Sequence, residues 1–255
     1  MKKNFPVVLA IGGHDPTGGA GIQSDIETIT SHDCHAVSLI TCLTSQNTER
    51  FLTLDPVNPS TFATQAKTLI SDIHIDVIKI GAVGNFKIVE KIYDLINSMQ
   101  NTAVIVDPVI KSSTGGLLAN KETIEALKSL ILPKSFLITP NLDEVKALSG
   151  EDNLDQSLEA LCELCQQYIL VKDVEESEKS VINNLYSKSK LLKHWESPRK
   201  EGQFHGTGCS LASSIACFIA KSVNILESID LAQKHTLKAI NNSIGIGKGQ
   251  KILKF

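Results

Sequence analysis

The sequence predicts an α/β protein with three layers, α/β/α, in which helices cover both faces of a mostly parallel central sheet. Short apolar runs, typical of buried strands, alternate along the chain with longer stretches of helical periodicity. The run at residues 103–106 is apolar throughout, as are strands of a parallel sheet that is covered on both faces. Glycine or polar residues follow most of these runs. Ligands of such sheets bind beyond the carboxyl ends of the strands.

Each expected strand is an apolar or β-branched run that stops at glycine, proline or a polar residue, and each expected helix repeats apolar residues three or four positions apart. In the first half of the chain the expected strands cover residues 5–11, 35–44, 76–81 and 102–109, and the expected helices cover 22–29, 60–73 and 86–99. In the second half we expect strands at 135–139 and 168–172, a hairpin of 180–186 with 190–195, and helices from Asn141, at 155–166, at 210–220 and at 226–244.

Composition and charge restrict the kind of partner. The 255 residues are 42% hydrophobic and 21% charged, as is usual for a globular protein, and no repeat or linker divides them, so residues 1–255 are expected to form one domain. The net charge of −3 argues against nucleic acid or an anionic membrane held by bulk charge. An anionic substrate would therefore be bound by local N–H groups, by lysines or by a metal.

The cysteines and the apolar runs indicate a compartment. Six cysteines lie mostly in apolar segments without a disulfide-like framework, which predicts reduced thiols in the cytoplasm. Cys162 and Cys165 have the spacing of a metal or redox pair, but they lie in an amphipathic helix without a second pair, which favours packing. No run approaches the roughly 20 residues that span a bilayer. The short apolar segment after Lys2 and Lys3 leads into a glycine loop and is not taken as a signal peptide.

A glycine-rich loop at residues 12–21 joins the first strand to the first helix. It ends neither in the Gly-Lys-Ser/Thr of a Walker A loop nor in the glycine spacing of a dinucleotide fold. The loop either brings its backbone close to a ligand or is a structural turn. Asp25, one turn into the helix, either complements the helix dipole or points into the site.

Polar residues follow three other expected strands. Gln46 suits ligand recognition, although a polar turn is the alternative. Asp107 is well placed for magnesium or phosphate. Asn141 and Glu144 have the spacing of a helix capping pair, which is as good an explanation as a metal role. Gly13, Gln46, Asp107, Asn141 and Cys209 all follow expected strands or stand at helix starts, and they are expected to converge on one cleft.

The segment 204–212 combines a glycine-broken turn with the start of a small-residue helix. Gly206 and Gly208 allow close approach to a ligand, and the free N–H groups of a helix start favour an anion. Cys209 lies in that first turn, where a thiolate is stabilised and the pKa is expected to fall. The alternative is a loop with a buried cysteine that packs like alanine.

Six segments in register resemble the hydroxymethylpyrimidine/phosphomethylpyrimidine kinases, thiamine-biosynthesis enzymes of the ribokinase superfamily. The segments are residues 13–25, 43–48, 79–81, 107–109, 139–144 and 205–210. The resemblance implies a ribokinase-like fold, a homodimer, and two successive phosphorylations by ATP with Mg²⁺. The first gives the phosphate of 4-amino-5-hydroxymethyl-2-methylpyrimidine, and the second gives the diphosphate.

The resemblance also implies residue roles. Gly13, Asp25 and Gln46 would line the pyrimidine pocket, with Val109 packing on the ligand. Gly206, Thr207, Gly208 and Cys209 would form the anion hole, with Cys209 as the base. Asp107, Asn141 and Glu144 would serve Mg-ATP, with the two carboxylates toward the metal, and Lys172 would lie near the phosphates.

The chain departs from the family pattern at several positions: His14 for serine, Gly116 for aspartate, Asp173–Glu176 for two glycines and a histidine, Phe204 for a small polar residue, and an altered glycine-rich end at 245–251. These departures affect the ATP side more than the pyrimidine side. Two alternatives therefore stay open: a pyridoxal-type kinase of the same fold, and a non-catalytic pyrimidine-binding protein. A dinucleotide-dependent oxidoreductase lacks the required glycine spacing.

Overall fold

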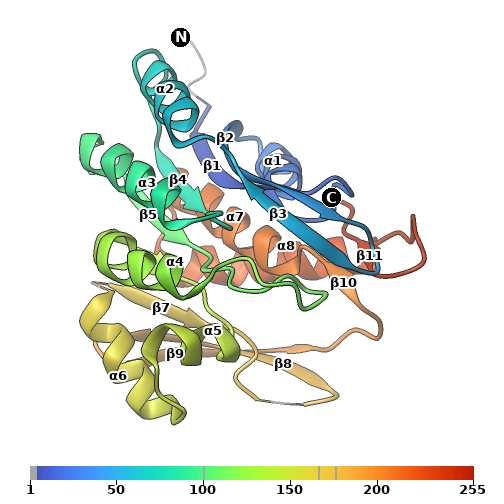
Figure 1. Cartoon of the computed structure of the whole chain (residues 1–255). Helices are drawn as coiled ribbons and strands as arrows, with labels where there is room; N and C mark the ends of the chain where they lie inside the picture. The colour runs from blue at the N-terminus through green and yellow to red at the C-terminus, as the bar shows by residue number, and fades with distance from the viewer. Residues whose placement is uncertain (1–4, 100, 166, 176) are drawn as a thin grey trace.

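The computed structural model describes residues 5–99, 101–165, 167–175 and 177–255, and it confirms the three-layer α/β/α architecture (Figure 1). A nine-stranded sheet has the order β3-β2-β1-β4-β5-β6-β7-β8-β9. Its strands are β1 (Val7–His14), β2 (His35–Gln46), β3 (Phe51–Pro56), β4 (Val77–Ile80), β5 (Ala103–Val106), β6 (Leu137–Ile138), β7 (Tyr168–Val171), β8 (Ser180–Ser187) and β9 (Lys190–Pro198). Six neighbouring strands pair in parallel, in the order β2, β1, β4, β5, β6 and β7. The outer strands β3, β8 and β9 pair antiparallel.

Helices cover both faces of the sheet. One face carries α2 (Pro59–Ile70), α3 (Phe86–Ser98), α4 (Lys121–Ala126), α5 (Leu142–Ser149) and α6 (Leu154–Leu164), and the other carries α1 (Gly21–Ser31), α7 (Thr207–Ala220) and α8 (Ile225–Asn241) (Figure 1). Successive side chains of a strand point to opposite faces. In β1, Leu9 and Ile11 accordingly pack in the first core and Val8 and Ala10 in the second.

The sequence patterns missed elements that lack a buried run. Strand β3 is an antiparallel edge strand whose residues are all exposed or half-buried, so no apolar run marked it. Strand β10 (Phe204–His205) pairs in parallel with β11 (Lys251–Ile252) and is too short for a periodicity. Helix α4, with the π-helical turn Leu127–Ile131 that follows it, was also missed. The helix expected at 155–166 is α6, and its expected last residue lies outside the described residues.

Several expected boundaries were wrong. Strand β2 runs on through Gln46, because β3 pairs with this extension. Strand β5 ends at Val106, so that Asp107 lies just beyond the sheet. All six cysteines are free thiols, and Cys165 is buried with its sulfur 3.3 Å from Ser135 Oγ, as the packing interpretation predicted. No helix within the described residues is long and apolar enough to cross a membrane.

Candidate active site

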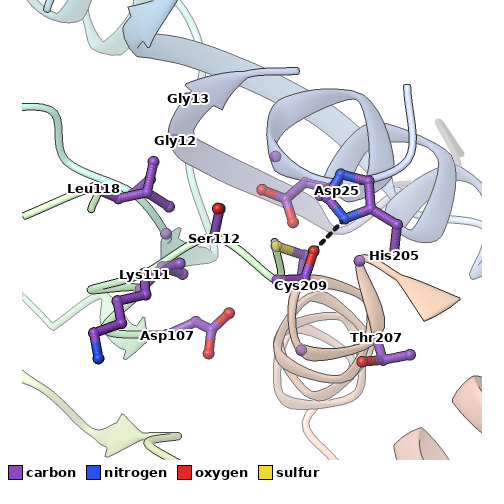
Figure 2. Close-up of a pocket in the computed structure, with 18 of the residues that line it drawn as sticks. Gly12, Gly13, Asp25, Asp107, Lys111, Ser112, Leu118, His205, Thr207 and Cys209 are labelled. Atoms are coloured by element: carbon purple, nitrogen blue, oxygen red, sulfur yellow. Dashed lines mark hydrogen bonds between the residues drawn. The ribbon is translucent and has the colours of Figure 1, made fainter. Parts of the chain in front are cut away.

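The expected site residues line one cavity of about 210 Å³ at the carboxyl ends of the parallel strands. The residues that the sequence singled out and the structure brings together there are Gly13, Asp25, Gln46, Asp107, Val109, Asn141, Glu144, Lys172, Gly206, Thr207, Gly208 and Cys209. Figure 2 shows Cys209 at the start of α7, with the carboxylates of Asp25 and Asp107 nearby. The prediction that Gly13, Gln46, Asp107, Asn141 and Cys209 converge on one cleft is therefore confirmed.

The amino end of α7 presents the backbone N–H groups of its first turn to the cavity. Gly206 precedes the helix with a φ of 82° and makes no side-chain cap. A Cβ at this position would collide with the backbone carbonyl of Gly19, so only glycine fits. The first amide that bonds back within the turn is Ser210 N, which donates to Gly206 O at 2.9 Å. Thr207, Gly208 and Cys209 precede it and line the cavity, which creates a favourable place for an anion.

Cys209 corrects one expectation. Burial raises the pKa of its thiol to about 11, and the nearby charges of Asp25 and Asp107 add to this. Lys79 and the amide of Gly21 act in the opposite direction but do not compensate. The expected fall in pKa at the helix start is wrong because desolvation outweighs the helix dipole. Cys209 is a neutral thiol in the resting protein.

An ion pair lies on the floor of the cavity between two strand ends. Lys172, which follows β7, donates to Asp107 Oδ1 at 2.7 Å, and Thr139 Oγ1 donates to the same oxygen at 3.1 Å. Burial alone would raise the pKa of Asp107, but Lys172 and Lys79 outweigh it and hold the pKa below its ordinary value. Burial likewise would lower the pKa of Lys172, but Asp107 and Glu144 keep it raised. Both groups are therefore charged at neutral pH.

Asn141 and Glu144 form the capping box that their spacing suggested. Glu144 N donates to Asn141 Oδ1 at 2.9 Å, and Asn141 N donates to Glu144 Oε2 at 2.9 Å, at the start of α5. Both side chains nevertheless line the cavity. Burial raises the pKa of Glu144 to about 7, and the Asp107 charge contributes while Lys172 opposes. The capping explanation is thus confirmed.

The donor atoms suit a magnesium ion that shares its ligands with phosphates. Asp107 Oδ1 is occupied by Lys172 and Thr139, whereas no hydrogen bond to Oδ2 is found within the described ranges. Nor do those ranges hold a cluster of three or more acidic, histidine or cysteine ligands. Mg²⁺ commonly binds through one or two carboxylates plus substrate phosphates. Asp107 and Glu144 fit that pattern.

Sequence reasoning assigned no role to Lys79, which lines the cavity. Its ammonium donates to both oxygens of Asp25 at 2.7 and 2.8 Å, and Ser213 Oγ donates to Asp25 Oδ1 at 2.7 Å. Asp25 and Lys79 are fully buried. Burial would lower the pKa of Lys79, but Asp25 outweighs it and keeps the lysine charged. A single lysine inside the apolar run of β4 was the signal that could have marked it.

A second network fixes the glycine loop. The Asp15 carboxylate accepts from the backbone amides of Thr17 and Ala20, both at 2.9 Å, and lies 2.9 Å from His205 Nε2. The other His205 nitrogen lies 2.9 Å from Ser113 Oγ. Ser113 in turn donates to Gln250 Oε1 at 2.8 Å. The loop at residues 12–21, the loop at 111–116 and the start of α7 are thus tied together.

A second cavity of about 420 Å³ adjoins the first. Asn141, Lys172, Phe204, Thr207 and Gly208 line both cavities. Beyond this shared boundary the second cavity extends between the β8–β9 hairpin and α8, where Leu211, Leu237 and Ile240 contribute apolar surface. The two spaces therefore meet at the amino end of α7, over the Asp107–Lys172 pair.

The departures from the family pattern fall in different places. His14 lines the first cavity, and Phe204 lies on the shared boundary. A Cβ at Gly116 would collide with the Phe51 ring, so the absence of an aspartate follows from that contact. Gly247, Gly249 and Gln250 lie against Thr48, to which Gly249 and Gln250 donate, and residues 245–250 are not among the lining of the second cavity. Asp173 does line it; Glu176 lies outside the described residues.

Comparison with known proteins gives consistent similarities. The family model described as phosphomethylpyrimidine kinase matches residues 15–254. A hydroxymethylpyrimidine/phosphomethylpyrimidine kinase of Bacillus subtilis is 31% identical over 247 residues, which cover 94% of this chain and 91% of that protein. The enzyme of that name from Aquifex aeolicus is 30% identical over 98% of this chain and its own full length.

Solved structures show the same fold. The pyridoxal kinase of Staphylococcus aureus in complex with ADP superposes with a TM-score of 0.87 at 22% identity, over 98% of this chain and 93% of that chain. A phosphomethylpyrimidine kinase from Clostridium difficile superposes with a TM-score of 0.78 at 27% identity, over 93% of this chain and 100% of that chain.

Loss of Lys79 is expected to destabilise the fold strongly. The Lys79→Met variant leaves the Asp25 carboxylate buried without its cation, so the free energy of unfolding should fall by about 3–5 kcal/mol. Lys234→Met is the control, because the Lys234–Asp230 pair lies on the surface and its loss should change stability by less than about 1 kcal/mol. Thermal and urea unfolding measure both. Equal stability of the two variants would contradict the assigned importance of the buried pair.

Proposed function

The chain belongs to the phosphomethylpyrimidine kinase family, and we propose that it transfers phosphate from ATP to 4-amino-5-hydroxymethyl-2-methylpyrimidine and then to the monophosphate so formed. The product of the second step is the diphosphate used in thiamine biosynthesis. The proposal treats residues 1–255 as one kinase domain that acts in the cytoplasm as a homodimer.

One observation carries this proposal: two cavities meet at the start of α7, where Thr207, Gly208 and Cys209 precede the first amide that bonds back within the turn. An acceptor in the first cavity and a nucleotide in the second would bring their reacting ends together at Thr207, Gly208 and Lys172. Phosphoryl transfer needs mainly positioning and neutralisation of charge. The amides of α7 and the Lys172 ammonium supply both.

The acceptor side offers groups that match an aminopyrimidine. Gln46 Nε2 donates to Thr44 Oγ1 at 2.9 Å, and no residue that the structure describes bonds to Gln46 Oε1, which can accept from the exocyclic amino group. Gly13 allows the ring to approach the backbone, and Val109 offers an apolar contact. Asp25 is already paired with Lys79 and Ser213, so we assign it the task of holding the lysine charge beneath the ligand as well as lining the pocket.

The donor side is assigned to Asn141, Lys172 and Thr207, with Asp107 and Glu144 toward the metal. Bound Mg²⁺ would neutralise phosphate charge and orient the transferred group. The protein's own contribution is geometric: Thr139 and Lys172 hold Asp107 in place, and the capping box holds Glu144. Gly206, Gly208 and the neighbouring amides would stabilise charge on the transferred phosphoryl group.

The two steps make different demands on Cys209. An alcohol must lose its proton as it attacks, so the first step needs a base. We assign that role to Cys209, which lines the first cavity. A phosphomonoester has a second pKa near ~6 and is largely deprotonated already, so the second step needs none. With a thiol pKa of about 11, only a small fraction of Cys209 is thiolate at neutral pH.

The test of this function is a time course followed by phosphorus NMR, with Mg-ATP and a panel of hydroxymethylpyrimidine and pyridoxal. We expect a pyrimidine monophosphate that is then converted to the diphosphate. Preferential phosphorylation of pyridoxal would support the alternative that the pyridoxal kinase structures raise. A protein that binds the pyrimidine but forms no product would be a binding protein and not a kinase.

Replacement of the thiol should separate the two steps. In Cys209→Ala we expect the first phosphorylation to slow by roughly 10²–10⁴-fold, the usual contribution of a general base. The second phosphorylation, measured with purified monophosphate, should change much less. Pyrimidine binding by thermal shift is the control for an intact pocket. Equal losses in both steps with binding intact would overturn the role of Cys209.

The pH dependence of the two steps should also differ. Because the Cys209 pKa lies near 11, the thiolate fraction grows about tenfold per pH unit below it, and kcat/KM of the first step should rise with pH between about 7 and 10. The second step should be level above about pH 7, because its nucleophile is already ionised. Loss of the rise in Cys209→Ala would identify the titrating group. Parallel profiles for both steps would contradict the assignment.

A further inference from the structure

An ion pair between Asp173 and Arg199 forms part of the wall of the second cavity. Arg199 Nη2 donates to both oxygens of Asp173, at 2.6 and 2.8 Å, and Arg199 Nε donates to the carbonyl of Ser177 at 2.6 Å. Both residues line the cavity. Asp173 belongs to the acidic stretch that replaces two glycines and a histidine. The sequence alone predicts that the carboxylate of Asp173 repels a phosphate.

The guanidinium of Arg199 is fixed in orientation but not saturated. Nε and Nη2 are held by Ser177, Asp173 and, at 3.3 Å, the carbonyl of Ser180. Within the described parts of the chain, Nη1 has no hydrogen-bond partner, and the side chain remains 34% exposed. A planar guanidinium with a free edge is suited to phosphate oxygens, and pre-orientation lowers the entropy lost on binding.

The backbone at Asp173 is held in a conformation that suits glycine better. Its φ is 52°, in the left-handed region. The Asp173 amide donates to Asn183 Oδ1 at 3.0 Å, and Asn183 Nδ2 donates to Gln233 Oε1 of α8 at 2.7 Å. A non-glycine residue in such a conformation is kept only when its surroundings fix it. Here the fixed residue supplies the carboxylate that orients Arg199.

The charges around the cavity also favour an anion. Its described lining contains three cations, Lys172, Arg199 and Lys200, against the single anion Asp173. Lys172 is engaged by Asp107 from the floor of the first cavity. Arg199 and Lys200 follow one another directly after the end of β9 and are the cations available to a ligand on this wall.

We propose that Arg199, oriented by Asp173, binds the polyphosphate of the nucleotide in the second cavity. Arg199 is then a specificity residue for the phosphate donor, and Asp173 is a positioning residue that strengthens nucleotide binding. The inference rests on the proposed function, because it takes the second cavity as the nucleotide site. It reverses the expectation that the acid at position 173 weakens the ATP side.

Two variants test the proposal by direct binding. Dissociation constants of ATP and of adenosine are measured by calorimetry without the pyrimidine, so that no transfer is required. In Arg199→Ala the ATP constant should rise about tenfold or more, since a charge-assisted contact is lost, while the adenosine constant stays within about twofold. Lys190→Ala, which removes an exposed cation from β9, the strand that precedes Arg199, is the control and should leave both constants unchanged.

Asp173→Gly separates positioning from stability. Glycine relieves the positive φ, so the melting temperature should stay the same or rise, whereas ATP binding should weaken several-fold because Arg199 loses its orienting partner. Asp173→Asn keeps one acceptor oxygen and should lose less. The KM for ATP should rise in these variants, with kcat and the KM for the pyrimidine little changed.

Three results would overturn the proposal. Tighter ATP binding by Asp173→Gly would mean that the acid repels phosphate. If Arg199→Ala weakens the binding of ATP and of adenosine equally, the ion pair only fixes the shape of the loop and does not bind phosphate. Unchanged ATP binding in both variants would exclude Arg199 from the site while leaving the kinase assignment intact. If the unaltered protein binds no ATP at all, both the inference and the donor side of the proposed function fail.

Discussion

The ion pair between Asp107 and Lys172 is the interaction around which the candidate site is arranged. It joins the ends of β5 and β7, and Lys172 lies on the boundary that both cavities share. Other groups surround the pair. Thr139 donates to Asp107, the Glu144 carboxyl lies near Lys172, and the start of α7 lines the same cavity. The parallel topology is what brings these segments, distant in sequence, to one edge.

Burial sets the ionisation of the site more than the formal charges of its residues suggest. Desolvation keeps the Cys209 thiol neutral and raises the pKa of Glu144 to about 7, whereas Asp107, Lys172 and Lys79 stay charged because each faces an opposite charge. At neutral pH Asp107, Lys172 and Lys79 are therefore charged, whereas Cys209, the proposed base, is protonated. Such a division suits a protein whose first acceptor must be deprotonated and whose second acceptor is already an anion.

The sequence predicted the parts of the fold and site that have a local signal. Buried parallel strands are apolar runs, and Asp107 and Gln46 follow such runs, so both were found. Strand β3 and the β10–β11 pair were missed because neither contains a buried run. The pairing of Lys79 with Asp25 and of Arg199 with Asp173 depends on contacts between distant segments, which periodicity does not report. The Cys209 pKa was misjudged because a helix start is visible in the sequence and burial is not.

The central claim is that the donor and the acceptor occupy two cavities that meet over Asp107 and Lys172. A crystal structure with hydroxymethylpyrimidine and a non-hydrolysable ATP analogue tests it most directly. The account predicts the pyrimidine in the first cavity, the nucleotide in the second, and the terminal phosphate at the amino end of α7 beside Lys172. A nucleotide bound elsewhere, or a terminal phosphate that does not reach α7, would contradict it.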